Sequence, residues 1–147
     1  MENLNKKEYQ KFANRKVPKP TYIRNIIFAF IIGGGICTIG QYIANFLAKT
    51  GYNEEMVSTG TSIILVFFGS LLTGLGVYDK IGKIGGAGAA IPITGFANSI
   101  VAPAMEYKRE GFIFGVAAKM FLIAGPVLVY GVGSSIIIGL LIILFKK

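Results

Sequence analysis

The residues best suited to chemistry in this sequence are four polar side chains that stand among apolar ones. Thr94, Asn98 and Ser99 follow Pro92, and Lys119 lies well inside the last apolar run. A helix that starts after Pro92 would present free N–H groups that attract anions, with Thr94 and Asn98 on one face. A lysine at such depth is costly unless it is paired or faces water. These residues are therefore suited to lining a polar path for an anionic solute.

The same residues have structural interpretations that the sequence alone leaves open. Lys119 can extend to the lipid headgroups, or it can form an ion pair with Asp79, Glu106 or Glu110. The glycines and prolines around Thr94 can also belong to a kinked helix whose small residues serve only for packing. Both interpretations compete with a pore lining.

Enzymatic chemistry and metal binding are not expected. The chain has no histidine, and its single cysteine, Cys37, lies in an apolar run with no metal-ligand spacing around it. We interpret Cys37 as a small packing residue. Because no motif for a nucleophile, a metal or a phosphate cradle is present either, we expect no catalytic residue, no metal and no cofactor.

The composition predicts an all-α integral membrane protein with one domain. The chain has 147 residues, of which 53% are hydrophobic, and its mean hydropathy is +0.62. The net charge is +8, and about half of the basic residues precede residue 26, beside the first apolar run. This placement favours a basic cytoplasmic arm at 1–25, with membrane lipid as a secondary partner, and not a nucleic-acid-binding protein. Pro18 and Pro20 keep the arm from continuing straight into the membrane helix.

Four apolar segments make up the predicted transmembrane domain at 26–147. In the third, Pro92 and Pro103 interrupt the helix and Gly95 loosens it, so we expect a broken or re-entrant helix. The fourth would be roughly 50 Å long as a helix, against a hydrocarbon core of about 30 Å, so it must tilt, protrude or kink near Pro126. The predicted spans are 26–48, 57–78, 87–105 and 111–145.

The charge pattern favours four crossings. With four, the arm, the turn at 79–83 and the C-terminal lysines share one net basic side, which predicts that both termini are cytoplasmic. A re-entrant third segment would place Lys146 and Lys147 on the other side, which fits the rule less well.

Small residues spaced four apart predict close helix contacts, within the chain or between subunits. Such pairs are Ser70 with Gly74, Gly69 with Thr73, and Gly111 with Gly115. Gln41 lies beside a similar small face in the first span. Because four spans enclose little volume, we expect a homo- or hetero-oligomer.

These residues carry a resemblance to a known family. The stretch from Gly86 to Gly131, with its blocks "PITGFANS" and "AGPVLVYG", strongly resembles the stage V sporulation protein AC family of spore-forming Firmicutes. Residues 33–41 ("GGGICTIGQ") and 71–88 also match. The stage V sporulation protein AE family is similar over the same stretch, but the longer arm, with "PKP" at 18–20, favours AC.

The resemblance implies a subunit of the SpoVA complex in the inner membrane of the forespore and spore, so that the cytoplasmic side, to which the charge pattern assigns both termini, is the spore core. It implies a tension-responsive channel that moves dipicolinic acid, usually with calcium, during sporulation and germination, in contact with other SpoVA subunits. The alternative is a non-conducting scaffold subunit of the same complex. The chain has Ala89 and Ala102 where the family leads us to expect serine at one or both positions, so any path there is less polar. The family supplies no established binding residues to carry over.

Overall fold

The computed structural model describes residues 6–16 and 21–145, and within these ranges it contains helices and no strand, as predicted. Pro18, Pro20, Lys146 and Lys147 lie outside the described residues, so the predictions made for them stay predictions. The helices are α1 (Lys6–Lys16), α2 (Tyr22–Lys49), α3 (Glu54–Gly74), α4 (Tyr78–Gly85), α5 (Ala87–Ala90), α6 (Ile93–Glu106), a 3-10 helix (Lys108–Glu110), a π-helix (Phe112–Ala117) and α7 (Ala118–Phe145).

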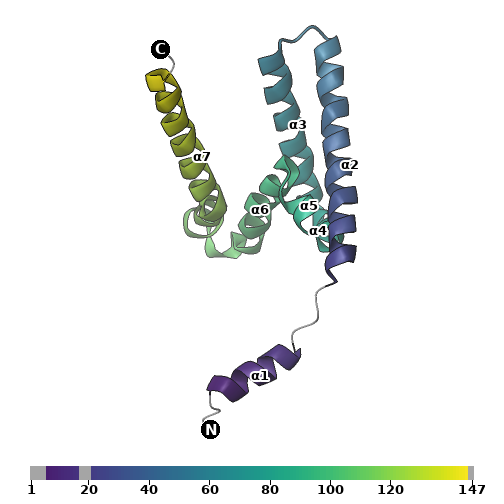
Figure 1. Ribbon diagram of the computed structural model, residues 1–147, viewed down its shortest axis with the longest axis vertical. Helices are drawn as coiled ribbons and strands as arrows, with labels where there is room; N and C mark the ends of the chain where they lie inside the picture. The colour runs from purple at the N-terminus through teal and green to yellow at the C-terminus, as the bar shows by residue number, and fades with distance from the viewer. Residues whose placement is uncertain (1–5, 17–20, 146–147) are drawn as a thin grey trace.

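α2 and α3 form an antiparallel hairpin that corresponds to the first two predicted spans (Figure 1). Both helices are long and apolar enough to cross a membrane. The turn between them is encoded locally, because Gly51 adopts a positive φ of 87° and the Asn53 side chain accepts the Met56 N–H at 2.8 Å. That cap satisfies one of the N–H groups that the first turn of a helix leaves free.

The third apolar segment folds as a re-entrant pair of short helices. Pro92, which has no N–H and an extended backbone (ψ 165°), separates α5 from α6. α6 has 14 residues and is therefore about 21 Å long, less than the roughly 30 Å of the hydrocarbon core. In Figure 1, α6 descends obliquely from the middle of α3 toward the end of the bundle where α4 lies. Of the two forms that the sequence allows, the structure has the re-entrant one.

This arrangement differs from the four crossings that the charge pattern favours. Among the described residues, three helical stretches are long and apolar enough to span a membrane: α2, α3 and 112–145. The beginning of α2 and the end of α7 consequently lie at opposite ends of the bundle (Figure 1). That both termini lie on the cytoplasmic side stays a prediction, because residues 1–5 and 146–147 lie outside the described residues.

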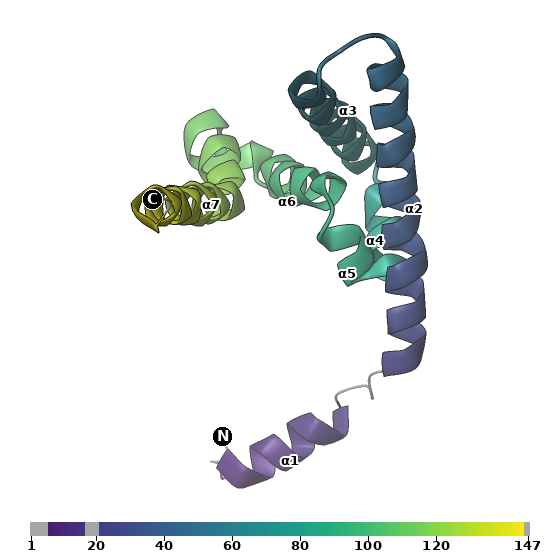
Figure 2. The same ribbon diagram turned by 45° about the horizontal axis from the view of Figure 1, so that its top comes forward.

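The fourth apolar segment is one helical stretch of 34 residues, Phe112–Phe145, in line with its predicted length. Its irregular part is the π-helix at its start, where the N–H groups of Gly115 and Val116 both donate to the Gly111 carbonyl. α7 continues on both sides of Pro126, so the chain does not break there, and a kink at this residue stays a prediction. Figure 2 shows that α7 lies beside α6 and far from α2.

Close backbone contacts hold the re-entrant pair against the α2–α3 hairpin. A Cβ on Gly88 of α5 would overlap the Ala29 carbonyl of α2, so only glycine fits where these two helices meet. On the other side, a Cβ on Gly69 of α3 would lie 2.9 Å from both the Cα and the carbonyl oxygen of Thr94 in α6. Small residues thus bring the backbones of α2 and α3 against the break between α5 and α6, as is typical of membrane helices.

Replacing Gly88 with alanine is expected to destabilise the bundle by about 1–3 kcal/mol, the usual effect of forcing extra atoms into a packed contact. The added methyl group meets main-chain atoms of Ala29, which cannot rotate away. The measurement is the melting temperature of the purified chain in detergent. Gly82→Ala in α4 is the matched control, because a Cβ there meets no atom within 4 Å and alanine favours a helix over glycine. Equal melting temperatures for Gly88→Ala and the unmodified chain would contradict the contact.

Candidate functional site at the re-entrant segment

The break between α5 and α6 is held by the hydroxyl of Tyr78, at the start of α4. Tyr78 is 3% exposed, and its hydroxyl donates to the Ala89 carbonyl at 2.8 Å and lies 2.7 Å from the Thr94 hydroxyl. Since the single Tyr78 proton is used on Ala89, the Thr94 hydroxyl is the donor in the second bond. Thr94 is itself 7% exposed. The first predicted path residue is therefore a buried member of a three-residue polar network.

A second polar contact joins α6 to α3 one turn further along. The hydroxyl of Thr73 lies 2.7 Å from the Gly69 carbonyl and 2.9 Å from Oδ1 of Asn98. One hydroxyl proton cannot serve both acceptors fully. With the Asn98 amide turned by 180°, its NH₂ group donates to Thr73 while Thr73 donates to Gly69, and both bonds are made. Asn98 thus fixes α6 against α3 and remains half-buried.

A groove of about 460 Å³ between α2 and α3 extends to Ile93, the first residue of α6. Polar atoms of its walls come from Gln41 of α2 and from α3, which contributes the Glu54 carboxylate beside the α2–α3 turn and the hydroxyls of Ser58, Thr61 and Ser62. The Thr61 and Ser62 hydroxyls donate to carbonyls four residues earlier in α3, at 2.7 and 3.0 Å. The groove therefore provides oxygen atoms along two otherwise apolar helices and leads to the N-terminal end of α6.

A separate cavity of about 310 Å³ beside the Tyr78–Thr94 pair is apolar. Both hydroxyls that reach it are already hydrogen-bonded within the network. A charged solute would lose its hydration there without new partners, so this cavity does not suit an anion. Its other lining residues are Ile36, Ile39, Ile43, Leu65, Phe68, Leu72 and Ile81.

The structure does not bring the four predicted path residues to one place. Lys119 lies at the far end of α6, where its Nζ is 4.0 Å from the centroid of the Tyr107 ring. Thr94 and Tyr107 are 13 residues apart, which is about 20 Å along a helix. The partner found for the Lys119 ammonium group is thus an aromatic face and not one of the acids considered from the sequence. Ser99 donates to the Phe96 carbonyl of its own helix at 2.8 Å.

The residues predicted to break the helix or to pack closely lie at different places in the structure. Pro92 forms the break, and Pro103 lies inside α6, where its carbonyl accepts the Tyr107 N–H at 3.0 Å. A Cβ on Gly95 would overlap the carbonyls at the end of α5, so Gly95 lets α6 fold back on α5. Gly115 similarly lies against the Tyr107 carbonyl.

Of the predicted pair Ser70 and Gly74, Gly74 lies outside the α3–α6 contact. Gly69 and Thr73, one position earlier, are buried there, whereas a Cβ on Gly74 or Gly111 would meet no atom within 4 Å. Gly111 has a φ of 96° and starts the π-helix. A contact of Gly74 or Gly111 with another subunit stays a prediction.

Sequence reasoning missed the structural importance of Tyr78 and the polar groove wall on α3. Tyr78 follows the second predicted span, a position typical of a tyrosine that anchors a helix at the membrane interface. The residues that it contacts lie 11 and 16 positions further along the chain. The hydroxyl spacing of Ser58 and Ser62 was the available signal for the groove, because positions four apart share a helix face.

Comparison with known proteins gives one family and one curated relative. The family model described as SpoVAC/SpoVAEB sporulation membrane protein matches residues 25–141. Stage V sporulation protein AC of Bacillus subtilis (strain 168) is 44% identical over 143 residues, which cover 97% of this chain and 95% of that relative. No solved structure matches the chain significantly.

Changing Tyr78 to phenylalanine is expected to lower the stability of the bundle by about 1–3 kcal/mol, because the buried Ala89 carbonyl and Thr94 hydroxyl lose their partner. The melting temperature in detergent reports the loss. Tyr42→Phe is the control, since Tyr42 is 74% exposed on α2. If Tyr78→Phe melts like Tyr42→Phe, the Tyr78 hydroxyl does not hold the break.

Proposed function

The chain belongs to the SpoVAC/SpoVAEB family of sporulation membrane proteins, and on that basis we propose that it is a channel subunit of the SpoVA complex. Its solute is dipicolinic acid, accompanied by calcium. It moves this solute across the spore inner membrane during sporulation and germination and opens under membrane tension. The chain acts without catalysis and shares the pore with other subunits.

The observation that carries this proposal is the position of the N-terminal end of α6. It lies part-way down the bundle, and the polar groove between α2 and α3 extends to it. The N-terminus of a helix carries a partial positive charge of about half an electronic unit and free N–H groups, which suit a carboxylate. Broken helices with this orientation form the solute sites of several transporters. Dipicolinate, a small aromatic dianion, is the kind of solute such a site attracts.

Different helices line the two halves of the proposed path. The groove along α2 and α3 serves the half of the membrane beside the α2–α3 turn, and α6 serves the other half. Thr94 marks the start of α6, and Lys119 provides a second positive charge about 20 Å further on. Because the described part of one chain leaves α7 beside α6 alone, the remaining wall comes from neighbouring subunits (Figure 2).

Tension acts on the contacts that small residues make. At Gly88 and Gly69 the helices meet through backbone atoms and not through interlocked side chains. Such surfaces slide more easily than interdigitated ones, so lateral stretching separates α7 and α6 from the α2–α3 hairpin and widens the groove.

A non-conducting scaffold is the second candidate, and one observation favours it. Among the described residues, no buried side-chain nitrogen or oxygen atom lacks a hydrogen-bond partner. Thr94, Asn98 and Ser99 are each bonded within the chain. A pore lining needs atoms free to meet the solute, so the two candidates must be separated by measured flux.

Purified chain in liposomes loaded with dipicolinate is expected to release it after osmotic downshock. Asn98→Leu and Lys119→Leu should each slow release by about tenfold or more, equivalent to about 1.4 kcal/mol of lost attraction. The matched controls are Asn25→Leu and Lys83→Leu, since both residues are exposed and neither lines the groove or belongs to α6. Spores that carry the two path variants should accumulate less dipicolinate than control spores.

The scaffold interpretation predicts the opposite set of results. Liposomes with the unmodified chain would retain dipicolinate under downshock, or folded Asn98→Leu and Lys119→Leu variants would release it at the unmodified rate. Either result contradicts conduction through the proposed path.

A further inference from the structure

α1 has two unlike faces. Positions 9, 12 and 13 share one face and carry Tyr9, Phe12 and Ala13, whereas Lys11 and Arg15 lie on the other. Of the eleven residues of α1, five are Lys or Arg and one is Glu. A basic helix with an aromatic face is typical of segments that lie flat in the interface of a membrane.

No other described helix covers the aromatic face of α1. Tyr9 and Phe12 are each 61% exposed. Figures 1 and 2 both show α1 apart from the bundle of α2 to α7. Lys16 places its Nζ 5.8 Å from the centroid of the Phe12 ring, so a cation flanks the aromatic surface. Burying the two rings in lipid would remove apolar area from water.

The chain length fixes where α1 can be. α1 ends at Lys16 and α2, a candidate membrane span, begins at Tyr22. Six residue steps reach at most about 21 Å, so α1 stays close to the membrane surface that α2 enters. Exposed charges more than a Debye length of about 8–10 Å apart are largely screened, so the headgroup charges attract α1 once it lies against the surface, within that distance.

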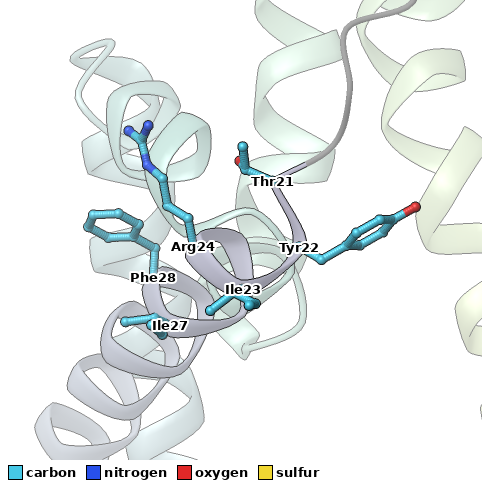
Figure 3. Close-up of a pocket in the computed structure, with 6 residues that line it drawn as sticks. All are labelled: Thr21, Tyr22, Ile23, Arg24, Ile27 and Phe28. Carbon is cyan, nitrogen blue, oxygen red and sulfur yellow. The ribbon is translucent and has the colours of Figure 1, made fainter.

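The first turns of α2 have the features of a helix at the headgroup level. Figure 3 shows the Arg24 side chain directed toward the N-terminal end of α2, beside the Phe28 ring. The guanidinium carbon lies 5.6 Å from the centroid of that ring. Tyr22 is exposed next to it. An arginine that extends toward the helix end and a tyrosine at the same level are typical of the membrane–water interface.

From these four observations we infer that α1 is an interfacial helix that binds anionic phospholipid headgroups of the membrane that α2 enters. Tyr9 and Phe12 insert at the acyl boundary. Lys11, Arg15 and Lys16 contact phosphate groups. Phospholipid is the occupant because the tether holds α1 at the surface and because its charge complements an anionic leaflet.

The absence of tryptophan from the chain makes a direct test available. In Phe12→Trp, reconstituted as the full chain, the single tryptophan reports the environment of the aromatic face. In vesicles of phosphatidylglycerol and phosphatidylcholine, its emission should shift to shorter wavelength, and lipids brominated on the acyl chain should quench it. Asn14→Trp, on the opposite face of α1, should keep solvent-like emission and show little quenching.

Charge dependence separates anionic lipid from other partners. In vesicles of phosphatidylcholine alone, and in Phe12→Trp combined with Lys11→Glu and Arg15→Glu, quenching of Trp at position 12 should fall strongly. Solvent-like emission at position 12 in phosphatidylglycerol would overturn the inference. So would a blue shift without quenching by brominated lipid, which indicates a protein partner or a second copy. Equal quenching at positions 12 and 14, or equal quenching with and without phosphatidylglycerol, would also overturn it.

Discussion

The fold depends on one constraint: a helix that breaks inside hydrocarbon leaves backbone groups that must find partners in the protein. Pro92 makes the break, and it has no N–H to offer to the helix before it. The Tyr78 hydroxyl then donates to the Ala89 carbonyl at the end of α5, while Thr94 donates to Tyr78. Gly88 allows α2 to close over the same region. A tyrosine hydroxyl and a glycine contact therefore hold the third segment in its folded-back form.

This constraint separates structural from solute-facing residues. Three buried residues hold the re-entrant pair: Thr73 of α3 is hydrogen-bonded to Asn98 of α6, and Tyr78 of α4 is hydrogen-bonded to Thr94 of α6. Their first role is therefore to stabilise that pair. The surface that can meet a solute lies in the groove that ends at Ile93 and along the outer face of α6 toward Lys119. The α2–α3 hairpin acts as a fixed support, whereas α7 meets the rest of the bundle mainly through α6.

The sequence predicted what local chemistry determines. Pro92 and the two long apolar runs sufficed for the break and for α2 and α3, and the motif blocks identified the family. The number of crossings could not be obtained in this way. Returning the third segment exchanges Lys146 and Lys147 for Lys108 and Arg109 on the side of the arm, so the number of basic residues on each side is the same in both topologies, and the charge rule did not discriminate. The contact of Lys119 with Tyr107 was not predicted either, because charge in the sequence indicates acids and lipid headgroups as partners of a lysine and does not indicate an aromatic ring.

The most direct test of this account is the sidedness of three positions. In a Cys37→Ser background, single cysteines at Tyr52, Lys80 and Glu110 can be labelled with a membrane-impermeant maleimide in sealed vesicles of known orientation. A re-entrant third segment predicts that positions 80 and 110 react from the same side and position 52 from the other. Labelling of position 110 from the side of position 52 would show that the segment crosses the membrane, and would contradict the account.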